Sequence, residues 1–476
     1  MDKILYTFNG AEFTVGSALL EFSYLIAAIL FVLGLKYLSH PESARRGNFL
    51  AAAGMILAMI TTLLLHRDDA GNYIGLRNIL VIVITIIAGA VVGQLISKRV
   101  KMTAMPELVS FFNATGGAAS ALVGLLEFSN PDNESLLVTL LGLVIGAIAF
   151  SGSLIAYGKL SGKLGNLRAG LMKFINIFIL TGLVAFSVYI LLLPHPQETA
   201  WMIYLLFALA LLYGVLFVFP IGGADMPVVI SLLNSLTGIA AAMAGFIYHN
   251  LAMILGGIFV GAAGSILTVL MTRAMNRSLI NVIIGGFGGG GGGPAGEEGG
   301  NIKEITLSDA AVLLAYSKSV VIVPGYGLAV AQAQHAIHEL EKLLEEKGVS
   351  VNFGIHPVAG RMPGHMNVLL AEADVPYDKL VEMDEINKNI ASADVVVVVG
   401  ANDVVNPAAN ETPGSPIYGM PVINAAQARN VIVMKRGMGK GYAGIENPLF
   451  FKDNTRMLFG NARDSLQKLL GEVNAL

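Results

Sequence analysis

A short glycine-containing motif in the second half of the chain has the spacing of a nucleotide-binding turn. A β-branched run over 319–323 leads directly into Pro-Gly-Tyr-Gly at 324–327, and a helical pattern follows. Gly325 permits a tight turn, and Gly327 lets the backbone approach a pyrophosphate at the N-terminus of that helix. A second strand over 349–355 completes a βαβ unit. A tight turn without a ligand fits the same residues.

The charges around the predicted strands favour NADP over NAD. An NAD site places an acid at the end of the second strand, on the ribose 2′-hydroxyl, whereas this strand ends in His356-Pro357. A later strand over 430–434 runs into the cations Lys435 and Arg436. Arginine binds phosphate through two parallel hydrogen bonds, so this pair suits a dianionic 2′-phosphate. An exposed basic turn is the alternative interpretation.

A third strand, over 394–399, ends in the polar residues Asn402 and Asp403. Residues at the carboxyl ends of parallel strands face the ligand crevice, so we expect these two side chains near the nicotinamide, as the catalytic candidates. A helix N-cap at Asp403 fits the position equally well. Together the strands predict a Rossmann-like α/β domain with a parallel sheet over residues 302–476.

The first half of the chain has the composition of a membrane protein. Hydrophobic residues make up 55% of the whole chain and charged residues 13%, and the charges are about twice as frequent after residue 300 as before residue 285. Apolar runs of about 20 residues are long enough to cross hydrocarbon. Nine such spans are predicted, at 17–38, 48–65, 78–97, 106–127, 136–158, 170–193, 200–219, 225–248 and 251–274. The first is not expected to be a cleaved signal peptide, because it is long and follows a polar start.

The positive charges predict the orientation of this polytopic helical bundle. Loops after odd-numbered spans hold twelve Lys and Arg residues, whereas the N-terminus and the other loops hold three. We therefore expect a multi-pass inner-membrane protein with its N-terminus outside and its C-terminal domain in the cytoplasm. A glycine-rich linker over 281–301 separates the membrane domain, 1–280, from the α/β domain.

Two features exclude whole classes of function. A formal net charge of −3 provides no broad basic surface for nucleic acid. The chain has no cysteine, which excludes disulfides, thiolate zinc sites and iron–sulfur clusters, and no metal site is predicted.

Polar residues inside the predicted spans are candidates for a proton path. An Asp in mid-span costs about 2.5–3.5 kcal/mol, so such groups usually have a function. The candidates are Asp225, which opens the eighth span, Asn234, Asn113 and Ser153. Asp225 equally suits a helix N-cap, and Asn and Ser also serve helix packing. None of the eight histidines lies in the middle of a span.

Several longer motifs resemble one known family. The run Gly222-Gly223-Ala224-Asp225-Met226-Pro227, with Asn234-Ser235 and Ala274-Met275-Asn276-Arg277-Ser278, is similar to the membrane domain of proton-translocating NAD(P) transhydrogenases. The motif at 324–327, the segment 354–370, Gly400 to Asp403 and Lys435-Arg436 resemble its NADP(H)-binding domain. The resemblance runs from about residue 20 to the C-terminus, and it is to the beta subunit of the bacterial enzyme.

This resemblance implies hydride transfer between NAD(H), held by a separate alpha subunit, and NADP(H), held here, coupled to proton passage. It also implies a dimer of the assembled unit, surrounded by membrane lipid, and a nucleotide that lies reversed on the sheet. Many members have a relay histidine where this chain has Asn113, so that histidine would come from the partner, or Asp225 with water would replace it. The NADP contacts that the family implies are Tyr326, Val358, Ala359, Gly360, Arg361, Met362, Pro363, Gly400, Ala401, Asn402, Asp403, Val404, Gly419, Met420, Lys435, Arg436, Gly437, Met438, Gly439, Lys440, Gly441, Tyr442, Asn461 and Ala462.

Two other functions remain open at this point. One is a transporter or channel that is gated by a cytoplasmic Rossmann domain sensing a nucleotide. The other is a membrane dehydrogenase that reduces quinone, which is disfavoured because the sequence has no pattern for flavin, haem or cluster ligation.

Overall fold

A computed structural model describes residues 4–8, 11–39, 41–67, 72–100, 104–128, 136–164, 172–193, 200–222, 225–275, 300–441 and 443–476. Among these residues, nine helices are long and apolar enough to cross a membrane, which confirms the predicted spans. They are α1 (Val15–Leu38), α2 (Pro41–Leu65), α3 (Leu76–Arg99), α4 (Met105–Glu127), α5 (Leu136–Leu160), α6 (Met172–Leu192), α7 (Ala200–Val218), α8 (Met226–Ile247) and α9 (Leu251–Ala274). Most of the predicted linker lies outside the described residues.

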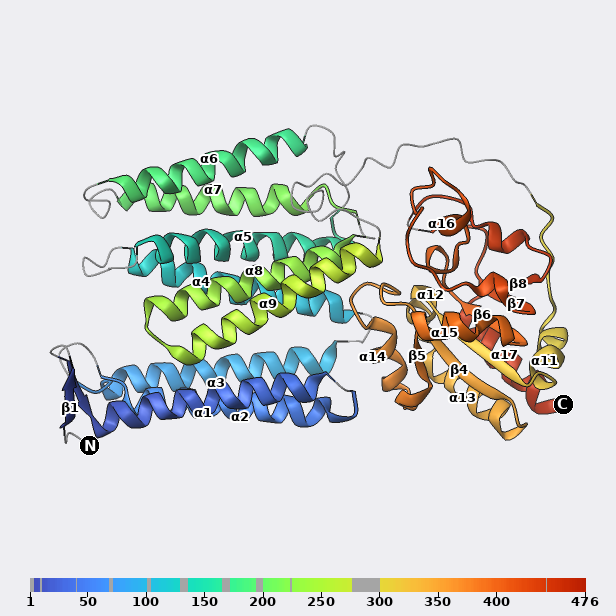
Figure 1. The fold of residues 1–476 in the computed structure, drawn as a ribbon, viewed down its shortest axis with the longest axis horizontal. Helices are drawn as coiled ribbons and strands as arrows, with labels where there is room; N and C mark the ends of the chain where they lie inside the picture. Colours follow the sequence, from blue (N-terminus) through green and yellow to red (C-terminus); the bar gives the residue numbers. More distant parts are fainter. Residues whose placement is uncertain are drawn as a thin grey trace.

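The nine helices run roughly parallel to one another, and an α/β domain lies at one end of the bundle (Figure 1). A small antiparallel hairpin, β1 (Ile4–Phe8) and β2 (Ala11–Thr14), precedes α1 at the opposite end. Because the number of described spans is odd, the chain enters the bundle at one end and leaves it at the other. Which end faces the cytoplasm stays a prediction.

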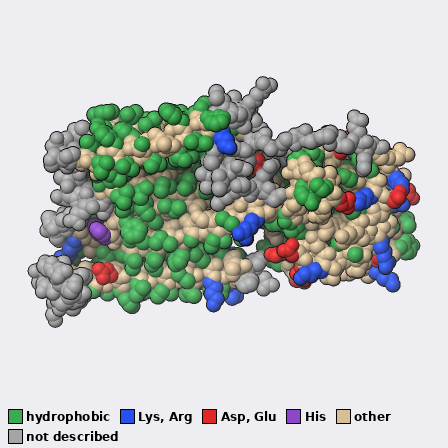
Figure 2. Space-filling model, turned by 45° about the horizontal axis from the view of Figure 1, so that its top comes forward, with side chains coloured by type: hydrophobic (Ala, Val, Ile, Leu, Met, Phe, Trp, Pro, Cys, Tyr) green, Lys and Arg blue, Asp and Glu red, His purple; other side chains and the backbone are tan. Residues whose placement is uncertain are grey.

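Small residues let the helices at the centre of the bundle approach closely. A Cβ added to Gly117 of α4 would lie 2.8 Å from the carbonyl oxygen of Gly146 on α5. A Cβ on Gly264 of α9 would lie 2.9 Å from the backbone nitrogen of Ser235 on α8. Such contacts are typical of membrane helices, where van der Waals packing replaces the hydrophobic effect. The flank of the bundle is covered by hydrophobic side chains, as Figure 2 shows.

The α/β domain is built on a parallel sheet of six described strands. In spatial order these are β5 (Leu380–Glu382), β4 (Ser350–Ile355), β3 (Ser319–Pro324), β6 (Val395–Val399), β7 (Asn430–Lys435) and β8 (Thr455–Phe459). The chain therefore starts in the middle of the sheet, runs to one edge and then returns to build the other half. This is the doubly wound order, and its ligand crevice opens where the order reverses, between β3 and β6. The predicted fold class is confirmed.

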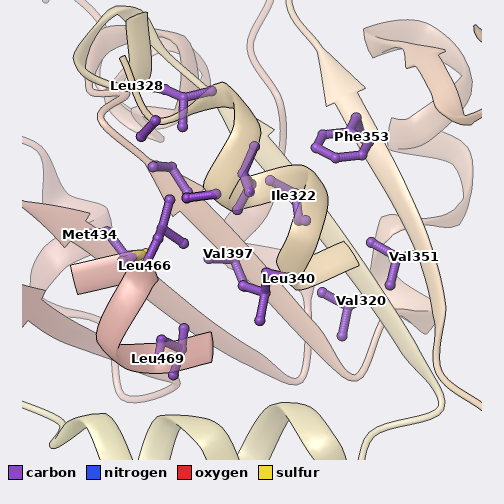
Figure 3. Packing of buried hydrophobic residues seen from close by; sticks show 14 of the residues in the cluster. Val320, Ile322, Leu328, Leu340, Val351, Phe353, Val397, Met434, Leu466 and Leu469 are labelled. Atoms are coloured by element: carbon purple, nitrogen blue, oxygen red, sulfur yellow. The ribbon is translucent and has the colours of Figure 1, made fainter. Parts of the chain in front are cut away.

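Helices cover both faces of the sheet and bury its β-branched strands. On one face, Ile322 and Val397 pack against Leu340 of α13 (Gln334–Glu346) and Leu466 of α17 (Ala462–Ala475), as Figure 3 shows. On the other face lies a second cluster, which includes Ile386 of α15 (Met383–Asn389). Strands buried on both faces read as continuous apolar runs, which is why the sequence revealed them. The remaining helices are α11 (Leu307–Ala315), α12 (Tyr326–Val330), α14 (His365–Glu372) and α16 (Ala408–Glu411).

The predicted helix after the glycine motif is in fact two helices. Helix α12 ends at Val330, and α13 begins at Gln334. Between them Gln332 has a φ of 51°, a left-handed conformation that interrupts the helical hydrogen bonds. The break lets the short α12 follow the crevice while α13 packs along the sheet.

Candidate nucleotide-binding site

A cavity of about 900 Å³ opens at the carboxyl ends of the strands, where β3 and β6 separate. Its walls come from the loops after β3, β4, β6, β7 and β8, and two residues of the membrane bundle, Asp225 and Met275, also line it. The predicted residues among its lining are Gly325, Tyr326, Gly327, Val358, Ala359, Gly360, Gly400, Ala401, Asn402, Asp403, Val404, Met420, Lys435, Arg436, Gly437, Gly439, Lys440, Gly441, Asn461 and Ala462.

The two glycines of the motif allow the loops after β3 and β6 to touch. The Gly325 N–H donates to the Val399 carbonyl and the Gly327 N–H to the Gly400 carbonyl, both at 2.9 Å. A Cβ on Gly327 would lie 2.6 Å from the Gly400 Cα, and Gly400 itself has a φ of 65°. The two glycines therefore bring the backbones of the loops after β3 and β6 together, and they also line the cavity.

Cations gather on the wall formed by the end of β7. Lys435 donates from Nζ to the Gly439 carbonyl at 2.8 Å, and its ammonium lies 4.5 Å from the centre of the Phe450 ring. Burial lowers the pKa of Lys435, and the charge of Asp403 opposes that shift. Arg436 and Lys440 are exposed residues of the same wall. A dianionic phosphate would find three cations there.

The N-terminus of α17 adds backbone donors to the same cavity. Asn461 caps this helix by accepting from the Arg463 N–H, and Asn461 and Ala462 both line the cavity. The first N–H groups of a helix have no partner within the helix, and they lie at its positive dipole end. This end of the cavity therefore suits a phosphate group.

Asp403 and Asn402 hold the loop after β7 in place. Asp403 accepts at Oδ2 from the Ala443 N–H at 3.0 Å, and Gly441 lies so close that a Cβ there would meet the carboxylate. The Asn402 carbonyl and Oδ1 both accept from Nδ2 of the buried Asn447, at 3.0 and 3.1 Å. Asn402, and not Asp403, takes the N-cap position of the short helix that follows. These contacts give both catalytic candidates a structural role at the cavity wall.

The segment after β4 is fixed by a neutral histidine. The Val358 N–H donates to Nδ1 of His356 at 3.2 Å, so Nδ1 carries no proton and Nε2 donates to the Pro421 carbonyl at 2.9 Å. Burial lowers the pKa of His356 to about 4, which keeps the ring neutral at physiological pH. Burial also lowers the pKa of the nearby His365, and the charge of Arg361 adds to that shift.

Some predicted residues lie away from the cavity, and some cavity residues were missed. Arg361, Met362, Pro363, Gly419 and Met438 do not line it, and Tyr442 lies outside the described residues. The lining residues that the sequence analysis did not name are Val330, Ala331, Pro416, Ile417, Met434, Ala443 and Gly460. Gly460 comes directly after β8, just as Gly325 comes directly after β3. A glycine at the end of a predicted strand was therefore the sequence feature that could have identified Gly460 as a lining residue.

The proton-path candidates separate into three places. Asn113 of α4 donates from Nδ2 to the Ser153 Oγ of α5 at 2.8 Å, and Ser110 donates to the Ser153 carbonyl at 2.8 Å; all three are buried. Asp225 is buried at the cavity, at the N-cap position of α8. Asn234 is exposed on α8. Ser110 was missed, although its spacing of three from Asn113 places both on one helix face.

The cavity lies at the switch point of a doubly wound sheet, and cations and a helix N-terminus that suit phosphate line it. The domain that contains it is joined to a helical bundle. Together these features define a membrane protein with a dinucleotide-binding domain. The chain matches the family model described as "NAD(P) transhydrogenase beta subunit" over residues 20–472. It is 45% identical over 466 residues to the NAD(P) transhydrogenase subunit beta of Rhodospirillum rubrum, covering 95% of this chain and 98% of the relative. A second sequence of that subunit, from a named strain of the same organism, matches equally. The chain belongs to the family of NAD(P) transhydrogenase beta subunits.

This membership confirms the predicted family and enzyme class. The chain is a subunit of an NAD(P)+ transhydrogenase, and its nine apolar helices make it a multi-pass membrane protein. The interpretation as a channel with a nucleotide sensor is set aside.

Proposed function

We propose that the cavity binds NADP(H) and that hydride passes between this nucleotide and NAD(H) on an alpha subunit, in step with proton movement through the bundle. The observation that carries the choice of nucleotide is the cation pair Lys435 and Arg436, which stands on the cavity wall at the end of β7. No acid stands at the end of β4, where an NAD site would hold the ribose hydroxyl; His356 and Pro357 occupy that place.

The lining residues fit such a nucleotide group by group. Lys435, Arg436 and Lys440 would hold the 2′-phosphate, and the N-terminus of α17 would face a second phosphate. The bound nicotinamide supplies the carbon that accepts or releases hydride, so the protein needs no acid or base for that step. Asp403 and Asn402 would then shape the wall beside it through their loop contacts, which excludes water and fixes orientation.

The alpha subunit is proposed to cover part of the bundle at α8. Asn234 lies nine residues into this 22-residue helix and its side chain is exposed in the isolated chain. An amide facing hydrocarbon lacks hydrogen-bond partners, so another polar surface at this position is favourable. All residues of α3 are described and none of them is buried. This helix therefore faces lipid or a further chain. A dimer of the assembled unit follows from the family resemblance alone.

The proton path is proposed to pass the buried Asn113 and Ser153 and to reach Asp225 at the cavity. Amide and hydroxyl groups orient a path but cannot titrate, so the ionisable group in mid-span would come from the alpha subunit. One proton moving down about 100 mV releases about 2.3 kcal/mol, enough to shift a nearly thermoneutral hydride transfer about fiftyfold. The N-terminus is proposed to lie outside and the α/β domain in the cytoplasm, because of the distribution of positive loops.

Membranes containing both subunits provide the test. We expect reduction of an NADP analogue by NADH, accompanied by a pH change across the membrane, and no reaction from either subunit alone. Asp225→Asn should abolish the proton-coupled turnover. Hydride transfer without any pH change in the unmodified enzyme would refute the coupling, and full coupling in the Asp225 variant would remove that residue from the path.

A further inference from the structure

The C-terminal end of α5 touches the nucleotide domain through Arg361. The guanidinium donates from Nη1 to the Leu160 carbonyl, the last residue of α5, at 3.0 Å. It also lies over the Tyr326 ring, 4.6 Å from the ring centre. Its neighbours Ala359 and Gly360 line the cavity, but Arg361 does not, because its side chain extends toward the membrane bundle instead.

At the end of α5, the Leu160 carbonyl accepts its hydrogen bond from another domain. The last carbonyls of a helix have no partner within the helix. Here the turn after α5 satisfies the earlier ones: the Ser161 N–H donates to Tyr157, and the Gly162 N–H to Lys159. The Leu160 carbonyl accepts from Arg361, so the nucleotide domain completes the cap of a membrane helix.

The chemistry of this contact suits arginine in particular. The C-terminus of a helix is its negative dipole end, which favours a cation. A planar guanidinium can stack on an aromatic face and still direct a donor at a carbonyl, which an ammonium does less well. The Tyr326 ring therefore supports the guanidinium of Arg361, and the Leu160 carbonyl accepts a hydrogen bond from its edge.

A second contact lies beside the first. Val358, three residues before Arg361, packs against Val228 at the start of α8 and Met271 near the end of α9. On its other side the same segment is fixed by the hydrogen bond from His356 to Pro421. The segment is therefore attached to the nucleotide domain at one end and to three membrane helices at the other.

The same turn of α5 also supports the loop that leads to Asp225. Lys159 donates from Nζ to the Ile221 carbonyl at 2.6 Å and to the Phe219 carbonyl. Asp225 follows four residues after Ile221 and lines the cavity. One helical turn thus contacts both the described residues that precede Asp225 and the segment that carries Arg361.

We propose that Arg361 is a docking residue that fastens the nucleotide domain to the end of α5, with the Leu160 carbonyl as its acceptor and the Tyr326 ring as its support. This role differs from the NADP contact that the family resemblance implies for this position. The contact involves protein atoms only, and it does not depend on which nucleotide the cavity binds.

The absence of cysteine from the chain allows a direct test by cross-linking. Val358→Cys and Met271→Cys are introduced together into the full-length chain, which is assembled with its alpha subunit in membranes stripped of nucleotide. We expect an oxidant to join the two cysteines, and peptide mass spectrometry to measure the rate. Adding Arg361→Gln should lower this rate at least fivefold, whereas Arg361→Lys, which keeps a charged donor, should stay within about threefold. The matched control is Arg456→Gln on β8, which is expected to leave the rate unchanged.

Two outcomes would overturn the proposal. One is the absence of any cross-link in the parent pair, and the other is an unchanged rate after Arg361→Gln. If Arg361→Gln fails to assemble, Tyr326→Leu removes the ring beneath the guanidinium and should lower the rate at least twofold; an unchanged rate there also contradicts docking. Because nucleotide is absent throughout, an error in the NADP assignment would leave these results unaffected.

Discussion

Acidification should destabilise the nucleotide domain, and the buried His356 should account for a measurable part of the loss. Its ring is neutral in the folded protein because burial lowers its pKa to about 4, whereas an unfolded chain restores about 6.5. The folded pKa is the lower one, so the unfolded state takes up a proton first as the pH falls. The contribution of His356 to stability is therefore complete above about pH 6.5 and is lost progressively between pH 6.5 and pH 4.

The size of the loss follows from this difference in pKa. A difference of about 2.5 units corresponds to about 3 kcal/mol once the pH is below both values. At pH 5 the unfolded histidine is almost fully protonated and the folded one is not, which gives about 2 kcal/mol. The protonated ring would also lose the bond in which Nδ1 accepts from the Val358 N–H.

Pulse proteolysis in urea measures this loss on the full-length chain. Samples are equilibrated at pH 7.5 or pH 5, moved to a common pH and cleaved briefly, so that only unfolded nucleotide domain is digested. His356→Gln keeps a donor for the Pro421 carbonyl but cannot titrate, and we expect its loss between the two pH values to be smaller by about 2 kcal/mol. His335→Gln, a change at an exposed position of α13, should behave like the unmodified chain. Equal pH dependence in all three proteins would refute the buried neutral histidine.

Three further changes test the cavity and the bundle. Arg436→Ala should weaken NADP+ binding to the assembled enzyme about tenfold or more in equilibrium binding, because a charged hydrogen bond to phosphate is lost, and unchanged affinity would remove this residue from the phosphate site. Gly441→Ala sets a methyl group against the Asp403 carboxylate, so the loop must move, and NADP+ affinity measured in the same way should fall severalfold; a wild-type value would contradict the close packing. Ser153→Ala leaves the buried Asn113 amide without its acceptor, at a cost of about 1–3 kcal/mol, and a lower thermal midpoint in detergent should report it, whereas no change would argue against that bond.

The sequence predicted the elements of this protein well, because burial leaves a clear pattern in residue types. A membrane span is a long apolar run, and a strand buried on both faces, such as Val395–Val399, is a short one. The crevice followed from these, since the residues after parallel strands meet at one edge of the sheet. Most residues named for the NADP site line the cavity for that reason.

The direction of individual side chains could not be predicted in the same way. Asn113 and Asn234 both lie in apolar helices, and only packing decides that one is buried and the other exposed. Arg361 lies within a segment that lines the cavity, yet its side chain reaches a carbonyl 201 residues earlier in the chain. The break between α12 and α13 lies at Gln332, which is left-handed although it is not a glycine, so the residue type did not predict the break.

The contact between the loops after β3 and β6 limits how this site can be altered. The hydrogen atoms of Gly327 and Gly400 occupy the space where any larger group would force the two strand ends apart. A larger residue at Gly327 or at Gly400 would therefore require the opposite loop to move. Such a substitution would widen the cavity between β3 and β6 before it changed which nucleotide the cavity prefers. In the loop after β7, a Cβ on Gly437 or Gly439 would meet no atom within 4 Å, so a new nucleotide preference is most readily introduced at these two positions.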